Sequence, residues 1–305
     1  MRIEHREWVR LSSNGVSEVY SQMYTCEEPK AIIQIAHGMS ERSERYRTFM
    51  QYLANQGYMV CANDHLGHGK SSNGEFGVFA KEAGGFEYII EDMHRLFEEV
   101  KQIYPDVPFV LVGQSMGSIL SALFADRYNY LSKLILMGTP AYNNFVEYME
   151  RGLRKSVEKH GYTHTSKVWN RIIWGKEPIA REKKIKHYSW LTTERQFVEE
   201  FVDDELCGHM FVDSANLEMM SGLIKWGNRN WGRNIPNIPI LFLVGTKDKI
   251  ANYGKGTAYY YDLLQKTHTH LKLQMVEGNR HEVLNEYNRE NTYQYILEWL
   301  ESVKN

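Results

Sequence analysis

The chain has 305 residues, of which 43% are hydrophobic, so it can bury one large core or a core with a smaller appended domain. Lys and Arg number 36 against 38 Asp and Glu, and the formal net charge of -2 gives no long-range field that would recruit nucleic acid or an anionic membrane surface. The three cysteines, Cys26, Cys61 and Cys207, are far apart and odd in number, which excludes a complete set of internal disulfides and favours a cytoplasmic location.

The amino-terminal region begins with several charged residues and continues with alternating apolar and polar residues. Charged residues are spread over positions 2–7, where a secretory signal peptide would need an apolar stretch. No window of the chain approaches the roughly 20 apolar residues of a membrane span, so we expect no integral membrane segment. Two alternating stretches, 2–11 and 16–26, flank the turn residues 12–15 and predict an antiparallel hairpin with one wet face.

Later strands are expected where short, nearly continuous apolar runs occur, because strands of a parallel sheet are buried on both faces. Amphipathic helical patterns separate these runs. The alternation predicts an α/β fold: a mostly parallel eight-stranded sheet with an antiparallel amino-terminal hairpin and helices on both faces. The nearly continuous apolar runs are 31–36, 109–112, 134–137 and 240–244. Further strands are expected over the runs 59–63 and 271–276, and a last helix over 288–303.

One interval, 141–233, breaks this alternation because it contains helical patterns only. We expect it to be a helical cap, or lid, on a core formed by 1–140 and 234–305. In its first helix, one stripe is expected to consist of Phe145, Met149, Leu153 and Val157. Such stripes either pack against the main domain, or their aromatic and Met side chains line an apolar pocket for a flexible hydrocarbon.

The strongest local signal is Gly113-Gln114-Ser115-Met116-Gly117, which follows an apolar run and opens a helical stretch. This setting predicts a nucleophile elbow, a sharp turn that holds Ser115 in a strained conformation. Gly113 and Gly117 let the neighbouring backbone pass without a Cβ clash. The start of the following helix aims amide donors at a developing oxyanion. We therefore predict that Ser115 is the nucleophile of a serine hydrolase.

A serine hydroxyl needs a base, and the chain order expected for such an elbow is Ser, then acid, then His. His281 lies in a polar loop directly after the run 271–276 and is the predicted base. Asp248 directly follows the run 240–244 and is the predicted acid that orients the imidazole. His268 and His270 precede the last strand, at the far edge of the sheet, and are expected to be solvated.

The loop after the third predicted strand should complete the oxyanion hole. Gly38 permits a tight backbone there, and the amide of Met39 is the expected donor beside that of Met116. His37 is expected to buttress this loop rather than to catalyse. The segment 64–71 contains two histidines and one Asp, too few for a convincing metal site, so we expect it to pack beneath the loop.

In these motifs the chain resembles the monoacylglycerol lipase and lysophospholipase-like branch of the α/β-hydrolases, also labelled serine-aminopeptidase-like hydrolases. The resemblance implies a cap inserted after the sixth core strand, and a monoacylglycerol, lysophospholipid or other simple carboxylic ester as substrate. Gln114 stands where His is common in that branch, and Met39 where a small residue is frequent. The motifs are His37-Gly38-Met39 with Glu41 and Tyr46, the segment 64–71, the segment 113–117, and Asp248 with His281.

The expected chemistry is two-step acyl transfer on an ester, without a metal or cofactor. A thioesterase or an aminopeptidase on the same triad is the alternative among enzymes. A non-catalytic binding protein of the same fold is a further alternative, although a binder needs no strained Ser115. An apolar cap could also touch a lipid surface transiently. An aminopeptidase needs a carboxylate for the substrate ammonium, and the candidates are Glu199, Glu200, Asp203 and Asp204, which otherwise form a solvated helix end.

Overall fold

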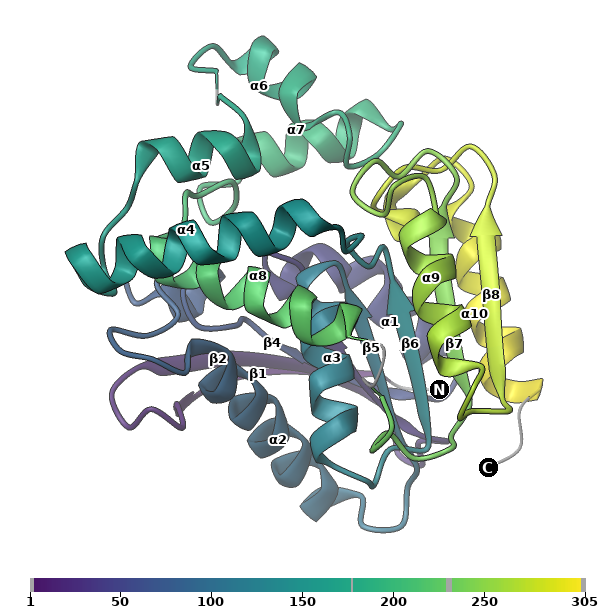
Figure 1. The fold of residues 1–305 in the computed structure, drawn as a ribbon. Coiled ribbons are helices and arrows are strands. Elements are labelled where there is room, and N and C mark those ends of the chain that lie inside the picture. Colours follow the sequence, from purple (N-terminus) through teal and green to yellow (C-terminus); the bar gives the residue numbers. More distant parts are fainter. Residues whose placement is uncertain (1–2, 177, 229–231, 303–305) are drawn as a thin grey trace.

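A computed structural model describes residues 3–176, 178–228 and 232–302 (Figure 1). Eight strands form one sheet in the order β1-β2-β4-β3-β5-β6-β7-β8. β1 pairs with β2 and β2 with β4 in antiparallel fashion, and all other neighbours are parallel, which confirms the predicted fold class. The strands are β1 (Glu4–Leu11), β2 (Glu18–Thr25), β3 (Ile32–Ala36), β4 (Met59–Asn63), β5 (Phe109–Gln114), β6 (Lys133–Met137), β7 (Ile240–Gly245) and β8 (Leu271–Val276).

The strands β3 to β7 are buried on both faces of the sheet, as the apolar runs predict, whereas the edge strands β1 and β8 are partly exposed. Along β5, Phe109 and Leu111 join one hydrophobic cluster, and Val110 and Val112 join another on the opposite face. Helices α2, α3 and α9 contribute to the first cluster, and α1 and α10 to the second (Figure 1). These helices are α1 (Arg47–Asn55), α2 (Gly85–Ile103), α3 (Met116–Arg127), α9 (Lys255–Leu264) and α10 (Arg289–Ser302).

Between β6 and β7, the described residues form the five helices α4 to α8, which we call the helical insertion. α4 and α8 pack against each other, α8 also packs against α3, and α5 to α7 lie farther from the sheet (Figure 1). The insertion lies over the carboxyl ends of the parallel strands. Its helices are α4 (Asn144–His160), α5 (Lys167–Trp174), α6 (Arg181–Tyr188), α7 (Arg195–Asp203) and α8 (Asp213–Gly227).

Two expectations from the sequence were wrong in detail. Phe145 is 53% exposed, and the buried stripe of α4 begins instead at Val146, because positions 146, 149, 153 and 157 follow the helical period more closely than steps of four. His268 is buried rather than solvated. Its Nε2 lies 3.1 Å from the carbonyl oxygen of Ile235, so a main-chain group takes the place of water.

Parts of three expected segments lie outside the described residues. They are residue 2 of the first strand, residue 303 of the last helix, and residues 177 and 229–231 of the interval 141–233. The three cysteines are buried and free. In the described part of the chain, no helix has both the length and the apolar character to cross a membrane.

Candidate active site

Ser115 occupies a strained turn between β5 and α3. Its backbone has φ 53° and ψ -117°, a conformation that costs energy for a residue with a Cβ. Its N–H donates to the Met137 carbonyl at 2.9 Å, which ties the turn to the neighbouring strand. A Cβ on Gly113 would collide with the carbonyl of Gly117, and a Cβ on Gly117 would collide with the carbonyl of Ala36. The two glycines are therefore required by close backbone approach on both sides of Ser115.

His281 and Asp248 form a buried pair at the carboxyl edge of the sheet. The Nδ1 of His281 lies 2.9 Å from Oδ2 of Asp248, with side-chain exposures of 4% and 0%. Because a carboxylate can only accept, Nδ1 carries the hydrogen and Nε2 is left as a base. Burial opposes the charged imidazolium, but the charge of Asp248 and its hydrogen bond outweigh burial and raise the pKa of His281.

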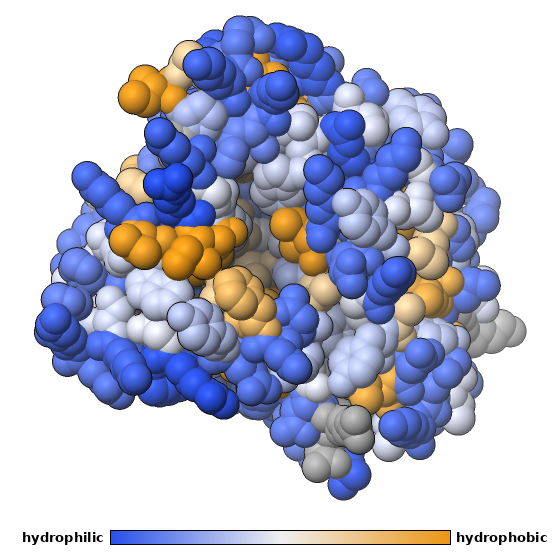
Figure 2. Space-filling model, turned by 45° about the horizontal axis from the view of Figure 1, so that its top comes forward, coloured by the Kyte–Doolittle hydropathy of each residue, from blue (hydrophilic) through white to orange (hydrophobic). Residues whose placement is uncertain are grey.

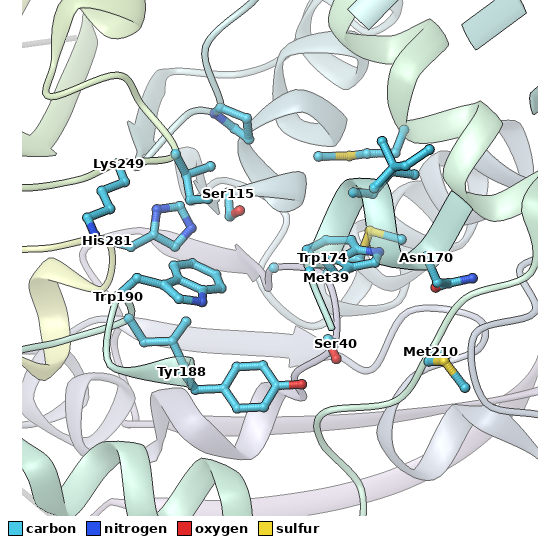
Figure 3. Close-up of a pocket in the computed structure, with 18 of the residues that line it drawn as sticks. Met39, Ser40, Ser115, Asn170, Trp174, Tyr188, Trp190, Met210, Lys249 and His281 are labelled. Atoms are coloured by element: carbon cyan, nitrogen blue, oxygen red, sulfur yellow. The ribbon is translucent and has the colours of Figure 1, made fainter. Parts of the chain in front are cut away.

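The carboxylate of Asp248 is itself fixed by the backbone that follows it. Its Oδ1 accepts from the N–H of Ile250 at 2.8 Å and from that of Ala251 at 3.2 Å. Ser115 and His281 line the same cavity, and Figure 3 shows the hydroxyl and the imidazole side by side. The structure therefore brings all three residues of the predicted triad to one place, from loops after β5, β7 and β8.

Gln114 joins the serine turn to the histidine loop, a role that sequence reasoning missed. Its side chain is buried, and its Nε2 donates to the main-chain carbonyl of His281 at 3.0 Å. Gly138 packs against this contact: a Cβ there would lie 2.7 Å from Nε2 of Gln114 and 3.0 Å from the His281 carbonyl oxygen. The predicted base thus has its ring held by Asp248 and its backbone held by Gln114.

The loop after β3 lies directly against Ser115. A Cβ on Gly38 would come within 3.2 Å of the Ser115 Cβ, and the N–H of Gly38 donates to Oε1 of Glu41 at 2.6 Å. Met39 lines the cavity, and Met116 is the first residue of α3. Within the described ranges, no hydrogen-bond acceptor faces the N–H of Met39 or of Met116. Both amides are free to bind an oxyanion.

Three histidine rings pack beneath this loop. His37 donates from Nδ1 to the Gly38 carbonyl at 2.7 Å, and its Nε2 accepts from the N–H of His65 at 2.9 Å. The His37 ring lies 4.1 Å from that of His65 and 5.0 Å from that of His68. Burial and the adjoining His37 ring lower the pKa of His65 and of His68 well below the ordinary value. His65 and His68 are therefore held neutral, and the three packed rings support the loop.

Asp64, which precedes these histidines, has its carboxylate fully engaged. Its Oδ1 accepts from the hydroxyl of Ser43 at 2.6 Å, and its Oδ2 accepts from the N–H of Lys70 at 2.8 Å. Among the described residues, no group of three His, Cys, Asp or Glu side chains is arranged to hold a metal ion. The segment 64–71 thus packs under the loop through its own polar contacts.

A second feature missed from the sequence is a buried cation that links two loops of the site. Arg45 is paired with Glu282 at 2.6 Å and with Glu41 at 3.2 Å, and its side chain is 8% exposed. Glu41 holds the Gly38 amide, and Glu282 follows His281 in the chain. The ion pairs therefore connect the loop after β3 to the histidine loop. An i, i+4 Glu41–Arg45 pair was the only trace of this link in the sequence.

The segment between α6 and α7 closes over the histidine loop. The Trp190 ring centroid lies 5.2 Å from that of His281. The N–H of Glu282 donates to the Leu191 carbonyl at 2.7 Å, and Arg280 donates from Nη1 to the Thr192 carbonyl at 2.9 Å. The helical insertion is thus attached to the residues on either side of His281.

A cavity of about 750 Å³ separates the core from the helical insertion. Figure 2 shows apolar side chains on both sides of its opening, and Figure 3 shows Trp174, Met39 and Met210 on one side of Ser115 with His281 and Trp190 on the other. Methionine suits such a wall because its side chain adapts to flexible ligands. Five methionines line the cavity: Met39, Met149, Met210, Met219 and Met220.

The four acidic residues considered for a substrate ammonium point elsewhere. None of them is among the residues that line the cavity. Each has a polar partner outside it: Arg195 for Glu199, Gln196 for Glu200, Arg181 for Asp203 and Arg42 for Asp204.

Comparison with known proteins adds an independent finding. The family model described as serine aminopeptidase, S33 (Hydrolase_4), matches residues 27–288. A monoglyceride lipase homolog of monkeypox virus is 27% identical over 256 residues, covering 83% of this chain and 82% of that protein. The monoglyceride lipase of Mus musculus is 34% identical over 110 residues, so the match spans 36% of this chain and only 35% of that relative's length.

Two solved structures share the fold of this chain. A thermostable carboxyl esterase from Bacillus coagulans, in complex with glycerol, has a TM-score of 0.90 and 25% identity, with 98% of both chains covered. A soluble variant of monoglyceride lipase from Saccharomyces cerevisiae, in complex with a substrate analog, has a TM-score of 0.74 over 93% of this chain and 92% of its own. Its identity of 16% makes it a likeness of fold alone.

Proposed function

The chain belongs to the α/β-hydrolase family described as serine aminopeptidase, S33, and on this premise we propose that it cleaves carboxylic esters through an acyl-enzyme on Ser115. The observation that carries the proposal is that a strained Ser115 shares one cavity with the buried His281–Asp248 pair. Because it belongs to this family, the chain is a hydrolase related to the monoglyceride lipases and esterases. The assignment of individual residues rests on the geometry of the site.

The proposed reaction has two steps. His281 Nε2 takes the proton of the Ser115 hydroxyl while Oγ attacks the ester carbonyl, and the amides of Met39 and Met116 hold the resulting oxyanion. The tetrahedral intermediate collapses, the C–O bond to the alcohol breaks, and His281 returns the proton to the leaving oxygen. A water molecule, deprotonated by His281, then attacks the acyl-enzyme, and collapse releases the acid and restores the Ser115 hydroxyl. Asp248 stabilises the imidazolium in both steps.

The substrate class follows from the walls of the cavity. We propose that the helical insertion, within 141–233, acts as a cap on a core of 1–140 and 234–305, and that its apolar lining receives the acyl chain. A monoacylglycerol, a lysophospholipid or another simple ester fits such a lining. Phe145, Ile172 and Met210 line the cavity and are about half exposed, which supports transient contact of this rim with a lipid surface. The buried, free cysteines support a reducing, cytoplasmic location.

An aminopeptidase is the second candidate, and it has less support. A substrate ammonium needs a free carboxylate, but the acidic lining residues Glu41 and Glu282 are both paired with Arg45. A thioester would be cleaved by the same groups as an ester, so a thiol remains an alternative to the alcohol as leaving group. A binding protein without activity would gain nothing from a strained Ser115.

A comparison of leaving groups tests the proposal. The purified chain is assayed with p-nitrophenyl esters of graded acyl length and with aminoacyl p-nitroanilides. We expect kcat/KM for the best ester to exceed that for the best anilide by about three orders of magnitude or more, corresponding to roughly 4 kcal/mol in transition-state binding. A higher kcat/KM for an anilide would reject the ester assignment and favour a peptidase.

A further inference from the structure

The charges that line the cavity are unbalanced, although the whole chain is nearly neutral. We infer that the preferred ester carries a negative charge on its leaving group, and that Lys249 recognises this charge. This inference rests on the proposed ester hydrolysis, and it narrows the substrate from any simple ester to an anionic one, for which a phosphate monoester is the probe.

The acidic side chains of the lining are buried and paired with one arginine. Among the residues that the structure describes, the acidic ones that line the cavity are Glu41 and Glu282. Both are about 7% exposed and both form ion pairs with Arg45, and Glu41 also accepts hydrogen bonds from Gly38 and Tyr46. Neither carboxylate is available to a substrate, because both are buried and share Arg45, and the one negative charge that remains on this cluster is smaller than the positive charge of the lining.

The positive charges of the lining are not neutralised. Four lysine and arginine side chains line the cavity and are exposed. Within the ranges that the structure describes, none of the four forms an ion pair or a side-chain hydrogen bond. A cluster of one sign beside a low-dielectric wall attracts an anionic ligand even when the net charge of the molecule is small. The four residues are Lys167, Arg171, Lys176 and Lys249.

The chemistry of the triad decides which of these cations meets the leaving group. His281 must return a proton to the leaving oxygen, so the alcohol part of the ester lies on the His281 side of Ser115. Figure 3 shows Lys249 on this side, beside His281 and Trp190, with the apolar wall around Trp174 on the other side of Ser115. Lys249 directly follows Asp248, whose carboxylate is held by the Ile250 amide, so its backbone is fixed relative to the triad.

Lys167 and Arg171 lie on α5 and Lys176 two residues after it, and all three are exposed residues of the lining. These three residues can attract an anionic substrate from solution. Of the four cations, Lys249 is the one that lies beside His281 on a backbone fixed relative to the triad. An ammonium group binds phosphate as a point charge, without demanding a planar partner. The combination of an apolar acyl wall and a cation on the leaving-group side fits an acyl ester of glycerol phosphate better than a neutral glyceride.

The test compares two soluble esters with the same acyl chain, octanoylglycerol and octanoylglycerol 3-phosphate, each below its micelle-forming concentration. The full chain is assayed for octanoate release, and the quantity of interest is the ratio of kcat/KM for the anionic ester to that for the neutral one. Lys249→Gln and Lys249→Glu are the test variants. Lys247→Gln is the matched control, because Lys247 is exposed on the other side of Asp248 and does not line the cavity.

We expect a wild-type ratio of about ten at low ionic strength, falling toward one in high salt as the charges are screened. Lys249→Gln should lower the ratio at least threefold, mainly through KM, Lys249→Glu should bring it below one, and Lys247→Gln should leave it unchanged. Octanoylglycerophosphocholine, whose net charge is zero, should resemble the neutral ester.

Two results would overturn the inference. A wild-type ratio of one or less would reject an anionic leaving group, and a ratio that survives in both Lys249 variants would reject Lys249 as its recognition residue. Labelling of the wild type by a fluorophosphonate separates these failures from a failure of the proposed function. A labelled enzyme with a ratio near one contradicts only the anionic subsite, whereas a folded enzyme that is neither labelled nor active contradicts ester hydrolysis itself.

Discussion

The side chain of Gln114 donates a hydrogen bond of 3.0 Å to the main-chain carbonyl of His281, so the residue before the proposed nucleophile holds the backbone of the proposed base. Both residues are buried, which makes the bond costly to lose. The contact fixes the distance between two loops that arise from different strands, β5 and β8. It gives Gln114 a positioning role that can be separated from chemistry.

Gln114→Met should test this role, because Met has a similar length but no donor. We expect kcat to fall by about tenfold or more, with a smaller change in KM, and the free energy of unfolding to fall by about 1–3 kcal/mol because the His281 carbonyl loses its partner. Steady-state kinetics and urea unfolding measure the two effects. Gln265→Met, at an exposed position, is the control. Wild-type kcat in Gln114→Met would rule out the positioning role.

The pH dependence of kcat/KM should report the His281–Asp248 pair. His281 must be neutral to accept the Ser115 proton, and its pKa is raised above the ordinary value of 6.5, so activity should be lost as the pH falls through a pKa above 6.5. Asp248→Asn removes the raising charge and should move this limb to lower pH, while lowering kcat by roughly three to four orders of magnitude. Asp262→Asn, exposed on α9, should change neither. An acid limb unmoved in Asp248→Asn would contradict the pairing.

The buried histidines His65 and His68 should make the protein sensitive to mild acid. The pKa values of His65 and His68 are lowered in the folded state, whereas an unfolded histidine titrates near 6.5. Below about pH 6.5 the unfolded chain therefore binds protons that the folded chain does not. The free energy of unfolding then decreases as the pH is lowered, by up to about 1.4 kcal/mol per pH unit for each such group.

His65→Gln removes one of these groups and should reduce the loss of unfolding free energy between pH 6.5 and 5.5 by about 1 kcal/mol, because the unfolded histidine is only half protonated at the upper pH. Urea unfolding at the two pH values measures the slope. His270→Gln, at an exposed histidine, should leave the slope as in the wild type. Equal slopes in the two variants would mean that His65 titrates normally in the folded protein.

The methionine wall predicts acyl-length selectivity. Met149 on α4 is 8% exposed and lines the cavity, so Met149→Trp should shorten the space for an acyl chain. We expect kcat/KM for p-nitrophenyl decanoate to fall at least tenfold relative to p-nitrophenyl acetate. Val16→Trp, in the hairpin turn and 84% exposed, provides the control for added bulk. An unchanged decanoate to acetate ratio would place the acyl chain elsewhere.

Much of the fold could be predicted because its signals are local. The apolar run of β5 is long enough to mark a strand with two buried faces, and Gly113 and Gly117 are demanded by backbone contacts within the turn itself. The positions of Asp248 and His281 followed from strand ends, which meet at one edge of a parallel sheet. These inferences used only neighbours in sequence and the geometry of a sheet.

The features that escaped prediction depend on residues far apart in the chain. Arg45 and Glu282 are separated by 237 positions, and no pattern near either indicates the other. The burial of His268 depends in the same way on Ile235, which packs against it from 33 positions earlier. Phe145 was misplaced for a different reason: steps of four drift around a helix of 3.6 residues per turn, so Val146 occupies the buried face.

The central claim, that Ser115 is the nucleophile, is tested most directly by covalent labelling. The wild type, Ser115→Ala and the control Ser302→Ala, at an exposed serine, are treated with a fluorophosphonate and examined by intact mass and peptide mapping. We expect one adduct on the peptide that contains Ser115 in the wild type and in Ser302→Ala, and none in Ser115→Ala with its fold intact. An adduct that persists in Ser115→Ala, or a folded wild type that is never labelled, would contradict the account.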